Sequence, residues 1–359
     1  MKKTFFALLL SFTVLSACAQ HKTENVFIIT LDGFRWQELY TGADENLIGD
    51  KDYVENTKEL SELFWRDTPE QRRETLMPFF WGVIAKEGQL LGNRNLGSMV
   101  NCTNNMWFSY PGYNEILTGK ADDERINSNA KIPNPNETIL EFANKQSGFE
   151  GKVAAFGSWD VFPSIINRER SGIPINAGFE KSTDEPLSER EIFLNRLQDE
   201  IPGPWGGVRL DAFTHHFAME YVKKHAPRLL YISYGETDDF AHDGEYDHYL
   251  KSARQTDQFI KELWDYIQST PQYKDKTTLI ITTDHGRGTE PKDKWRGHGR
   301  DIHNAGEIWM AAIGPDTPAK GEVKGGQYYQ NQVTPTVAEL LGLDYQLEGA
   351  GKPVKGFIK

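Results

Sequence analysis

Five short apolar segments, separated by longer segments with helical periodicity, most strongly constrain the fold of this sequence. The apolar segments are rich in β-branched and aromatic residues, and several of them end in Gly or Asp. Runs of this length and composition are typical of buried strands. They cover residues 25–31, 152–156, 228–234, 277–283 and 307–313. Strands alternating with helices predict an α/β fold with a mostly parallel central sheet and helices on both faces.

The segments between the strands complete this prediction. Helical periodicity covers residues 137–145, 212–224, 246–267 and 335–341. Residues 162–205 are rich in Pro, Gly and charge, which favours a cap or insertion beside the ligand-binding edge. No repeat or second independent unit is visible, so residues 25–359 are interpreted as one domain.

The first residues resemble a bacterial lipoprotein signal. Lys2 and Lys3 precede the apolar stretch 5–15, and the sequence Leu15-Ser16-Ala17-Cys18 resembles a lipobox. This pattern predicts a signal peptide over 1–17 and a tail over 18–24 that is lipidated at Cys18. We therefore expect export and anchoring by lipid in the bacterial cell envelope, on the periplasmic face or the cell surface. The alternative is an ordinary signal peptide with a chance cysteine.

The charge balance limits the partners of the chain. The formal net charge is -12, whereas a nucleic-acid-binding surface must be basic to displace counterions. Nucleic acid is therefore not expected as a partner, although bound cations would still allow a phosphate to bind. With Cys18 lipidated, Cys102 is left alone, and we interpret it as a structural thiol.

Carboxylates and imidazoles follow the predicted strands. Asp32 follows the first strand, residues 236–242 follow the third, and Asp284 and His285 follow the fourth. Residues 297–303, which contain two further histidines, precede the fifth strand. Parallel strands deliver their last residues to one edge of the sheet, where ligands bind. These ligand types predict a divalent metal centre there, with zinc favoured over manganese or iron.

The order of these motifs resembles the alkaline phosphatase superfamily, in particular its type I phosphodiesterase/nucleotide pyrophosphatase branch. Ser109 lies in Phe108-Ser109-Tyr110-Pro111-Gly112, which is similar to the T-F-P-N-like turn of that branch. Asp238 and His242 match its Asp-x-x-x-His pair, and Asp284 with His285 matches its Asp-His pair. The resemblance runs from about residue 25 to residue 343 and implies an alkaline-phosphatase-like fold.

The resemblance also implies an activity. It points to a small phosphorylated substrate, a monoester or a diester, that is hydrolysed with two divalent metal ions, zinc or manganese. Ser109 would be the nucleophile, activated by a metal, and would form a phosphoseryl intermediate. One ion would be held by Asp238, His242 and a final His, and the other by Asp32, Asp284, His285 and Ser109. Pro111 and Gly112 predict a tight turn before a helix near Tyr113, whose first N–H groups could hold phosphate oxygens.

Two positions have alternatives. His298 is preferred as the final His because His298-Gly299-Arg300-Asp301 resembles the His-Gly-x-Asp of the phosphodiesterase branch. His303, by its spacing to Gly314, resembles the true alkaline phosphatases. Asn127 and Asn129 both lie where the branch has a substrate-binding Asn, and Asn129 is selected with Asn127 as the alternative.

Two other functions compete with this hypothesis. A sulfatase shares the fold but needs a C/S-x-P-x-R motif, and Tyr113 stands where the Arg is required. A non-catalytic surface-binding lipoprotein is the other alternative. The Lys-x-Arg pair of some secreted phosphomonoesterases is absent from residues 157–161, which favours a diester or bulky substrate stacked on Trp159. Substitutes for that pair could come from Arg168, Arg170, Arg287 or Arg300.

Overall fold

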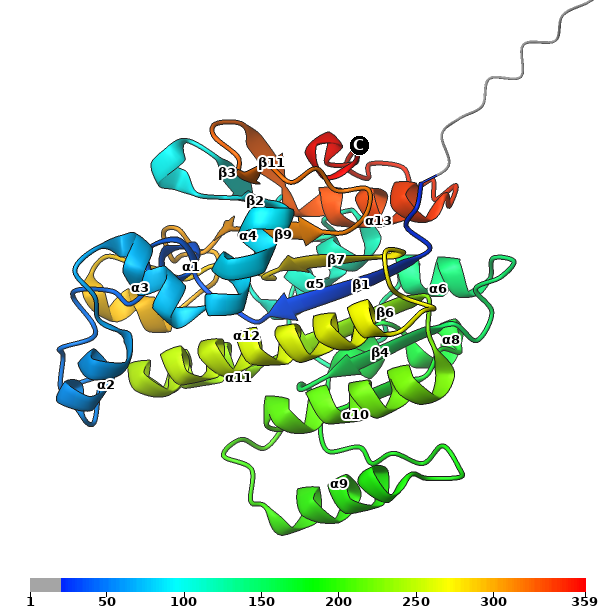
Figure 1. The fold of residues 1–359 in the computed structure, drawn as a ribbon, viewed down its shortest axis with the longest axis horizontal. Helices are drawn as coiled ribbons and strands as arrows, with labels where there is room; N and C mark the ends of the chain where they lie inside the picture. The colour runs from blue at the N-terminus through cyan, green and yellow to red at the C-terminus, as the bar shows by residue number, and fades with distance from the viewer. Residues whose placement is uncertain (1–20) are drawn as a thin grey trace, which may run out of the picture.

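The computed structural model describes residues 21–359, so the predicted signal peptide and Cys18 lie outside the described residues. A sheet of eight strands forms the centre of the molecule, in the order β10-β2-β9-β7-β1-β6-β4-β5 (Figure 1). A smaller sheet has the order β11-β3-β8. The predicted α/β fold with a mostly parallel central sheet is confirmed.

The strand β1 lies in the middle of the sheet. It covers Asn25–Leu31 and pairs in parallel with β6, Leu229–Tyr234, on one side and with β7, Thr277–Thr282, on the other. All residues of these three strands are buried, as their apolar composition requires for a sheet covered on both faces. Their carboxyl ends therefore meet at one edge of the sheet.

The remaining strands extend the sheet on either side. Beyond β6, the strands β4 and β5 are parallel to it, whereas β9 is antiparallel to both β7 and β2. The strand bounds are β2 Gln89–Leu91, β3 Met99–Asn101, β4 Val153–Gly157, β5 Ile175–Ala177, β8 Glu307–Ile308, β9 Met310–Ile313, β10 Gly321–Glu322 and β11 Gln327–Tyr329.

The predicted single strand over 307–313 is corrected. It is divided at Trp309 into β8, which pairs with β3, and β9, which joins the central sheet. The Trp309 ring is fully buried and its indole N–H donates a hydrogen bond of 2.8 Å to the carbonyl of Phe34. Because the indole turns into the core between the two short strands, the segment serves both sheets.

Helices cover both faces of the central sheet (Figure 1). Their bounds are α1 Trp36–Thr41, α2 Thr57–Phe64, α3 Pro69–Leu76, α4 Ala85–Glu87, α5 Ser109–Thr118, α6 Ile139–Asn144, α7 Phe162–Ile165, α8 Arg168–Ser171, α9 Glu189–Glu200, α10 Asp211–His225, α11 Glu236–Asp243, α12 Tyr246–Ser269 and α13 Val333–Leu341. The four helices predicted from periodicity correspond to α6, α10, α12 and α13, with shifts of two residues or fewer at their ends.

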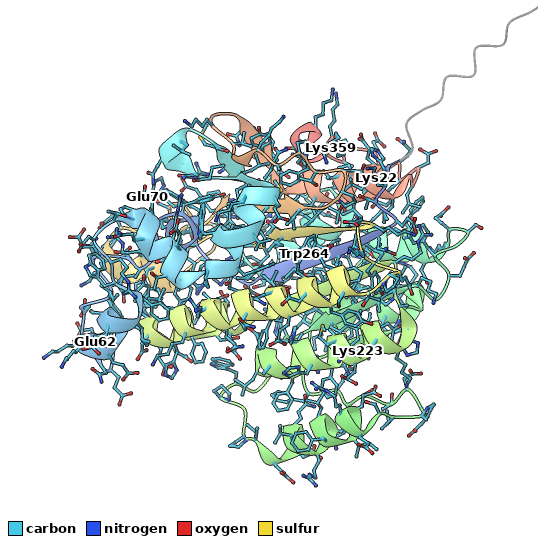
Figure 2. The ribbon with its side chains drawn as sticks, in the orientation of Figure 1. Lys22, Glu62, Glu70, Lys223, Trp264 and Lys359 are labelled. Carbon is cyan, nitrogen blue, oxygen red and sulfur yellow. The ribbon has the colours of Figure 1, made fainter. Side chains whose placement is uncertain are left out.

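Two apolar clusters form the core, one on each face. Successive side chains of a strand point to opposite faces, so Phe27 and Ile29 of β1 join the cluster under α10 and α12. Val26 and Ile28 join the second cluster, under α5, α6 and α13. Figure 2 shows side chains filling the space between these helices and the sheet.

The segment 162–205 has two parts. The first adds α7, α8 and the edge strand β5, which pairs in parallel with β4 and therefore belongs to the central sheet. The second carries α9, which contacts α10. A cavity of about 520 Å³ lies between β5, α9 and α10. At the end of the segment, the Trp205 indole donates a hydrogen bond of 2.8 Å to Asp243 at the end of α11.

No helix within residues 21–359 combines the length and the apolar character that crossing a membrane requires.

Candidate metal centre and active site

The sequence-predicted ligands lie where the central strands end. Asp32 directly follows β1, Asp238 lies in the first turn of α11 after β6, and Asp284 and His285 follow β7. Ser109 is the first residue of α5. All five residues are buried. The parallel register of β6, β1 and β7 therefore brings together side chains that are far apart in the sequence.

The first group consists of Asp32, Asp284 and His285, whose donor atoms lie within 4.8 Å of one another. Nε2 of His285 is 3.3 Å from Oδ1 of Asp32 and 3.4 Å from Oδ2 of Asp284. The same nitrogen is 3.4 Å from Oγ of Ser109. The hydroxyl oxygen thus lies beside the group, as the sequence led us to expect.

This first group has the chemistry of a cation site. Oδ1 of Asp32 and Oδ2 of Asp284 are buried and accept no hydrogen bond from any residue within 21–359. Burial raises the pKa of both carboxyl groups well above the usual range, and the charge of Asp238 adds to the effect at Asp32. Buried carboxylates need a partner to stay ionised. A divalent cation fits both orphaned oxygens.

The second group consists of Asp238, His242 and His298. Oδ2 of Asp238 is 3.2 Å from Nε2 of His242, and Oδ1 is 3.6 Å from Nε2 of His298. The two imidazole Nε2 atoms are 2.9 Å apart. Nδ1 of His298 donates to the carbonyl of Trp107 at 3.2 Å, which leaves its Nε2 as an acceptor pointing at the group. These three donors also fit a metal ion.

The two groups adjoin each other. The rings of His285 and His298 are stacked, with centroids 3.9 Å apart. Nδ1 of His285 donates to the carbonyl of Gly286 at 3.0 Å, so its Nε2 also faces inward. Six predicted ligands and Ser109 therefore form one continuous site.

His303 does not belong to this site. It is exposed, and no ion-pair contact joins it to a carboxylate within residues 21–359. His298, by contrast, is mostly buried between His285 and Asp238, and burial lowers its pKa well below the usual range. The imidazole that the fold brings to Asp238 is therefore that of His298.

The two asparagines also have different positions. Asn129 lines the site pocket, and its Oδ1 accepts a hydrogen bond of 3.0 Å from the backbone N–H of Tyr110. Because that donor fixes the oxygen, the NH₂ of Asn129 remains to act as a donor. The side chain of Asn127 instead donates to the carbonyl of Glu124 at 3.2 Å. Only the first arrangement places an amide beside Ser109.

The prediction that α5 begins near Tyr113 is wrong. The helix begins at Ser109, because Pro111 occupies the first turn, where its missing N–H removes no helical hydrogen bond. The first-turn N–H groups differ in whether they are free to bind a phosphate oxygen. The N–H of Tyr110 bonds Asn129, Pro111 has none, and the N–H of Gly112 bonds the Phe108 carbonyl at 3.1 Å. The N–H of Ser109, in the same turn, has no hydrogen-bond partner among residues 21–359 and therefore stays available to a phosphate oxygen.

A strained residue lies two positions before Ser109. Trp107 has φ of 52°, a region that bulky residues rarely adopt. Its indole packs so closely on Gly306 that a Cβ there would lie 2.7 Å from the ring. The packing holds the Trp107 carbonyl against His298, two residues before Ser109.

Two buried groups hold the carboxylates, and the sequence analysis did not assign these roles. The hydroxyl of Tyr113 donates to Oδ2 of Asp32 at 2.7 Å. Arg287 is fully buried and donates to Oδ1 of Asp238 at 2.6 Å and to the carbonyls of Asp238 and Trp295. Arg287 was considered as a phosphate ligand, but its guanidinium is occupied in this way.

The other arginines considered for substrate binding also have partners. Arg168 pairs with Glu180, and Arg170 pairs with Glu141. Arg300 lies against the sulfur of Met106 at 3.1 Å. None of the three lines the site pocket.

Gly33 allows the side chains of the site to pack closely around the end of β1. It has φ of +56°, and a Cβ at this position would lie 2.8 Å from Oδ1 of Asp238 and 3.0 Å from the His285 ring. Its backbone N–H donates to Oδ1 of Asp284 at 3.1 Å. The sequence shows an Asp-Gly pair after the first strand, but the close contacts of Gly33 depend on two distant segments, which contain Asp238 and residues 284–287.

A pocket of about 230 Å³ opens onto these residues. Its wall includes Ser109, Asn129, Trp159 and Val208. Asp239 also lines it, and burial together with the neighbouring carboxylates Asp238 and Asp32 raises the pKa of Asp239 to about 9. The excess of acidic groups again suits a site that binds cations. The larger cavity beside α9 contains none of the predicted ligands.

Comparisons with known proteins identify the family of the chain. A model of the Sulfatase family matches residues 24–343. The 2,3-bisphosphoglycerate-independent phosphoglycerate mutase of Serratia proteamaculans is 26% identical over 122 residues, which are 34% of this chain and 22% of the mutase. The same enzyme of Pseudoalteromonas atlantica is 26% identical over 127 residues, 35% of this chain and 23% of the mutase. The chain thus matches under a quarter of these relatives' length.

Solved structures share the fold. The alkaline phosphatase PafA superposes with a TM-score of 0.59 at 12% identity, covering 96% of this chain and 100% of PafA. Murine ectonucleotide pyrophosphatase/phosphodiesterase 5, in an inactive form with AMP, superposes with a TM-score of 0.57 at 13% identity. The superposition covers 94% of this chain and 100% of the murine protein. The lipoteichoic acid synthase LtaP from Listeria monocytogenes superposes with a TM-score of 0.56 at 13% identity, covering 93% of this chain and 74% of LtaP. Because the family model spans most of the sequence and the fold agrees, the chain belongs to the Sulfatase family, whose fold is that of the alkaline phosphatase superfamily of hydrolases.

Proposed function

We propose that this chain is an exported, lipid-anchored hydrolase that cleaves phosphate esters through a phosphoseryl intermediate on Ser109. The observation that carries the proposal is the position of the Ser109 oxygen, 3.4 Å from Nε2 of His285. That nitrogen lies in turn beside the orphaned oxygens of Asp32 and Asp284. Within residues 21–359, no carboxylate orients His285 through Nδ1, which donates to the Gly286 carbonyl as it would not in a Ser-His-Asp triad, and we assign its Nε2 to a cation that activates Ser109.

Two divalent cations, zinc or alternatively manganese, would supply the Lewis acidity that lowers the pKa of the serine hydroxyl and stabilises charge on phosphate oxygens. The first would be held by Asp32, Asp284, His285 and Ser109. The second would be held by Asp238, His242 and His298.

The chain positions these ligands through one oxygen of each carboxylate. Tyr113 bonds Oδ2 of Asp32, the Gly33 N–H bonds Oδ1 of Asp284, and Arg287 bonds Oδ1 of Asp238. The opposite oxygen of each carboxylate is thereby directed into the site. Such outer partners fix the orientation and basicity of metal ligands.

The proposed reaction has two steps. The Ser109 oxygen forms a bond to phosphorus while the bond from phosphorus to the leaving oxygen breaks, and water later hydrolyses the phosphoserine. The NH₂ of Asn129 donates to a phosphoryl oxygen during both steps, because it lines the same pocket as Ser109. A hydrogen bond that strengthens as charge develops on that oxygen lowers the barrier.

The pocket wall favours a diester or a bulky ester. Residues 157–161 hold no basic pair: Ser158 is buried and donates to Asp211 at 2.6 Å, and Trp159 lines the pocket. An indole offers a surface for an aromatic or sugar group on the far side of the phosphate. This preference resembles that of the phosphodiesterase branch.

A sulfatase activity is the competing proposal, since sulfatases share both the family and the fold. The observation against it is Tyr113, which stands at the Arg position of the sulfatase motif. Its ring is fully buried against Phe162, and its hydroxyl bonds Asp32. No basic group is therefore available at that position for the conversion of Ser109 to formylglycine.

The test uses the mature protein with zinc or manganese and three substrates. These are bis-p-nitrophenyl phosphate, p-nitrophenyl phosphate and p-nitrophenyl sulfate. We expect turnover of the phosphates, with the diester preferred, and its loss in Ser109→Ala but not in Ser269→Ala, an exposed control on α12. Turnover of the sulfate alone would favour a sulfatase. No turnover at all, with Ser109→Ala indistinguishable from the natural protein, would favour a binding lipoprotein.

Localisation has its own test. Labelling of growing cells with a radioactive fatty acid should mark the protein, and Cys18→Ser should remove the label. Recovery of unlabelled natural protein from the cytoplasm would contradict the proposed anchor.

A further inference from the structure

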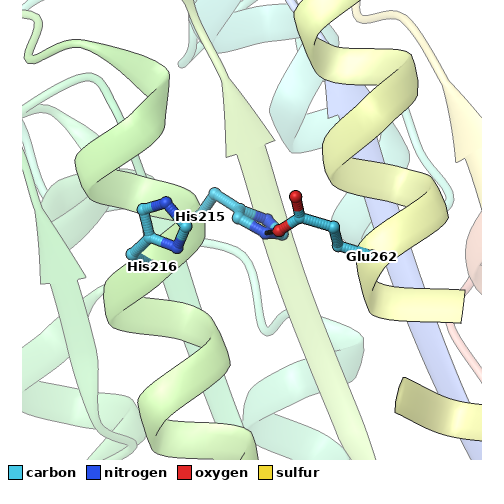
Figure 3. Close-up of side chains that lie close together, drawn as sticks. All are labelled: His215, His216 and Glu262. Carbon is cyan, nitrogen blue, oxygen red and sulfur yellow. Dashed lines mark hydrogen bonds and ion pairs between the residues drawn. The ribbon is translucent and has the colours of Figure 1, made fainter. Parts of the chain in front are cut away.

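Two imidazoles and a carboxylate form a cluster on α10 and α12, outside the active site. His215 and His216 lie on α10, and Glu262 faces them from α12 (Figure 3). One donor atom of each residue lies within 4.8 Å of the other two. The proposed phosphate chemistry uses none of them.

The buried ring of His215 is fixed by one stacking contact and by a polar contact at each ring nitrogen. It stacks on Phe259, with centroids 4.4 Å apart and an interplanar angle of 14°. Nδ1 is 3.0 Å from the hydroxyl of Tyr234, and Nε2 is 3.2 Å from Oε2 of Glu262. When Nδ1 donates its proton to Tyr234, Nε2 carries a lone pair aimed at a carboxylate oxygen. In this tautomer a cation can lie between the two acceptors, whereas in the other tautomer Nε2 donates to Glu262 and the hydroxyl of Tyr234 donates to Nδ1.

The state of the rings suits metal binding. Burial lowers the pKa of His215 to about 3 and also lowers that of His216. Both rings are therefore neutral near pH 7, as a metal ligand must be. The cations nearest the cluster are Arg190 and Lys223, and both pair with Glu220, at 3.0 and 2.9 Å. Glu262 supplies the negative charge of the cluster itself.

We propose that His215, His216 and Glu262 bind a zinc ion that joins α10 to α12, separate from the active site. Two imidazole nitrogens and one carboxylate oxygen are a zinc donor set that leaves a position for water. Nitrogen donors disfavour magnesium and calcium, which prefer oxygen. Bonds of about 2.0–2.2 Å draw the donors closer together. The half-buried His216 and the exposed Glu262 can turn to allow this.

The ion would connect helices that position the active site. Asp211, at the start of α10, accepts a hydrogen bond of 2.7 Å from the N–H of Gly235, the residue before α11. The helix α11 carries Asp238 and contacts α12. Zinc at the cluster would add a link between α10 and α12, which are already connected through α11. The three helices would then be joined pairwise, and the stability of the fold would rise.

The experiment counts zinc in the natural protein and in Glu262→Gln and His216→Gln. Each protein is stripped with a chelator, reloaded with zinc, dialysed and measured by mass spectrometry of the metal. Both variants change a residue that is exposed or half-buried, so the fold is expected to persist. We expect each variant to hold one zinc ion fewer per chain than the natural protein. His225→Gln, near the end of the same helix and paired with Asp184, should hold as much as the natural protein.

A second measurement follows the unfolding temperature. Zinc should raise it less in His216→Gln than in His225→Gln, because the first variant lacks a ligand that the second retains. Equal zinc content in the natural protein and both cluster variants would overturn the proposal. Because the result is a difference between variants, it does not depend on how many ions the active site holds.

Discussion

The guanidinium of Arg287 donates a hydrogen bond of 2.6 Å to Oδ1 of Asp238, and both side chains are buried. The pairing leaves Oδ2 of the same carboxylate 3.2 Å from His242. Despite burial, the charge of Arg287 holds the pKa of Asp238 well below its usual range, aided by His242. Asp238 is thus ionised and oriented before any metal arrives.

Replacement of Arg287 by Met should therefore leave a buried carboxylate without its partner. Removing one member of a buried pair costs about 3–5 kcal/mol, so the free energy of unfolding should fall by roughly 3 kcal/mol in the absence of metal. Urea unfolding of the chelator-treated protein measures this. Zinc should partly restore the stability, since a cation replaces the lost charge. An unchanged unfolding midpoint would show that Arg287 has no such role.

Replacement of Asp284 by Ala should remove a metal ion and most of the activity while the fold persists. The carboxyl group is fully buried with its pKa raised by burial, so the metal-free variant should be at least as stable as the metal-free natural protein. Metal analysis and circular dichroism test the two parts. Full metal content in Asp284→Ala would contradict the ligand assignment. Asp238→Ala should likewise hold one metal ion fewer than the natural protein.

Gly33→Ala should disrupt the site far more than the backbone alone explains. A left-handed Ala costs about 1–2 kcal/mol, and the Cβ would also lie 2.8 Å from Asp238. Gly172→Ala is the matched control, because Gly172 has φ of +63° but no atom within 4 Å of an added Cβ. We expect both variants to lose stability and only Gly33→Ala to lose metal and activity. Equal metal content in the two would show that the close contact is unimportant.

Asn129→Ala should lower kcat more than it raises KM, because its NH₂ is proposed to bond an oxygen on which charge develops. Loss of a comparable donor costs about 10²–10³ in kcat in other hydrolases. Asn127→Ala, which removes a side chain bonded only to Glu124 within residues 21–359, should change neither constant. Steady-state kinetics with the diester substrate decides. A pure KM effect would indicate a role in binding alone.

Acid should destabilise the metal-free protein through His215. Burial lowers its pKa from the ordinary 6.5 to about 3 in the folded state. The unfolded chain therefore binds the proton first, and the stability that is present above pH 6.5 declines as the pH falls from 6.5 to about 3. The decline can reach about 5 kcal/mol, at about 1.4 kcal/mol for each pH unit. His215→Asn should show a shallower decline in unfolding experiments with a chelator present.

Much of the site follows from the sequence because it depends on strand ends. A buried strand and the residue after it are local signals, so Asp32 and Asp284 could be placed at one edge before any coordinates were known. Ser109 and His298 were assigned through family resemblance, and the fold brings both to that edge. The Sulfatase family match and the shared fold confirm the superfamily, whereas the metals and the substrate remain proposals.

Other features depend on distant contacts and could not be predicted. Arg287 follows a recognised Asp-His-Gly sequence, but its partner Asp238 is 49 positions away. The division of strand 307–313 depends on Trp309 reaching the carbonyl of Phe34 across the core. The true start of α5 depends on Asn129, which accepts the Tyr110 N–H from a separate loop. Local periodicity contains none of this information.

The left-handed Trp107 has a consequence for how the centre can change. Its carbonyl fixes the His298 tautomer, and two residues later the same backbone presents the Ser109 hydroxyl. Residues 107–109 thus contact both the first group of ligands, through Ser109, and the second group, through the carbonyl of Trp107. A substitution that relaxes this kink is therefore expected to shift the Ser109 hydroxyl and the His298 imidazole together.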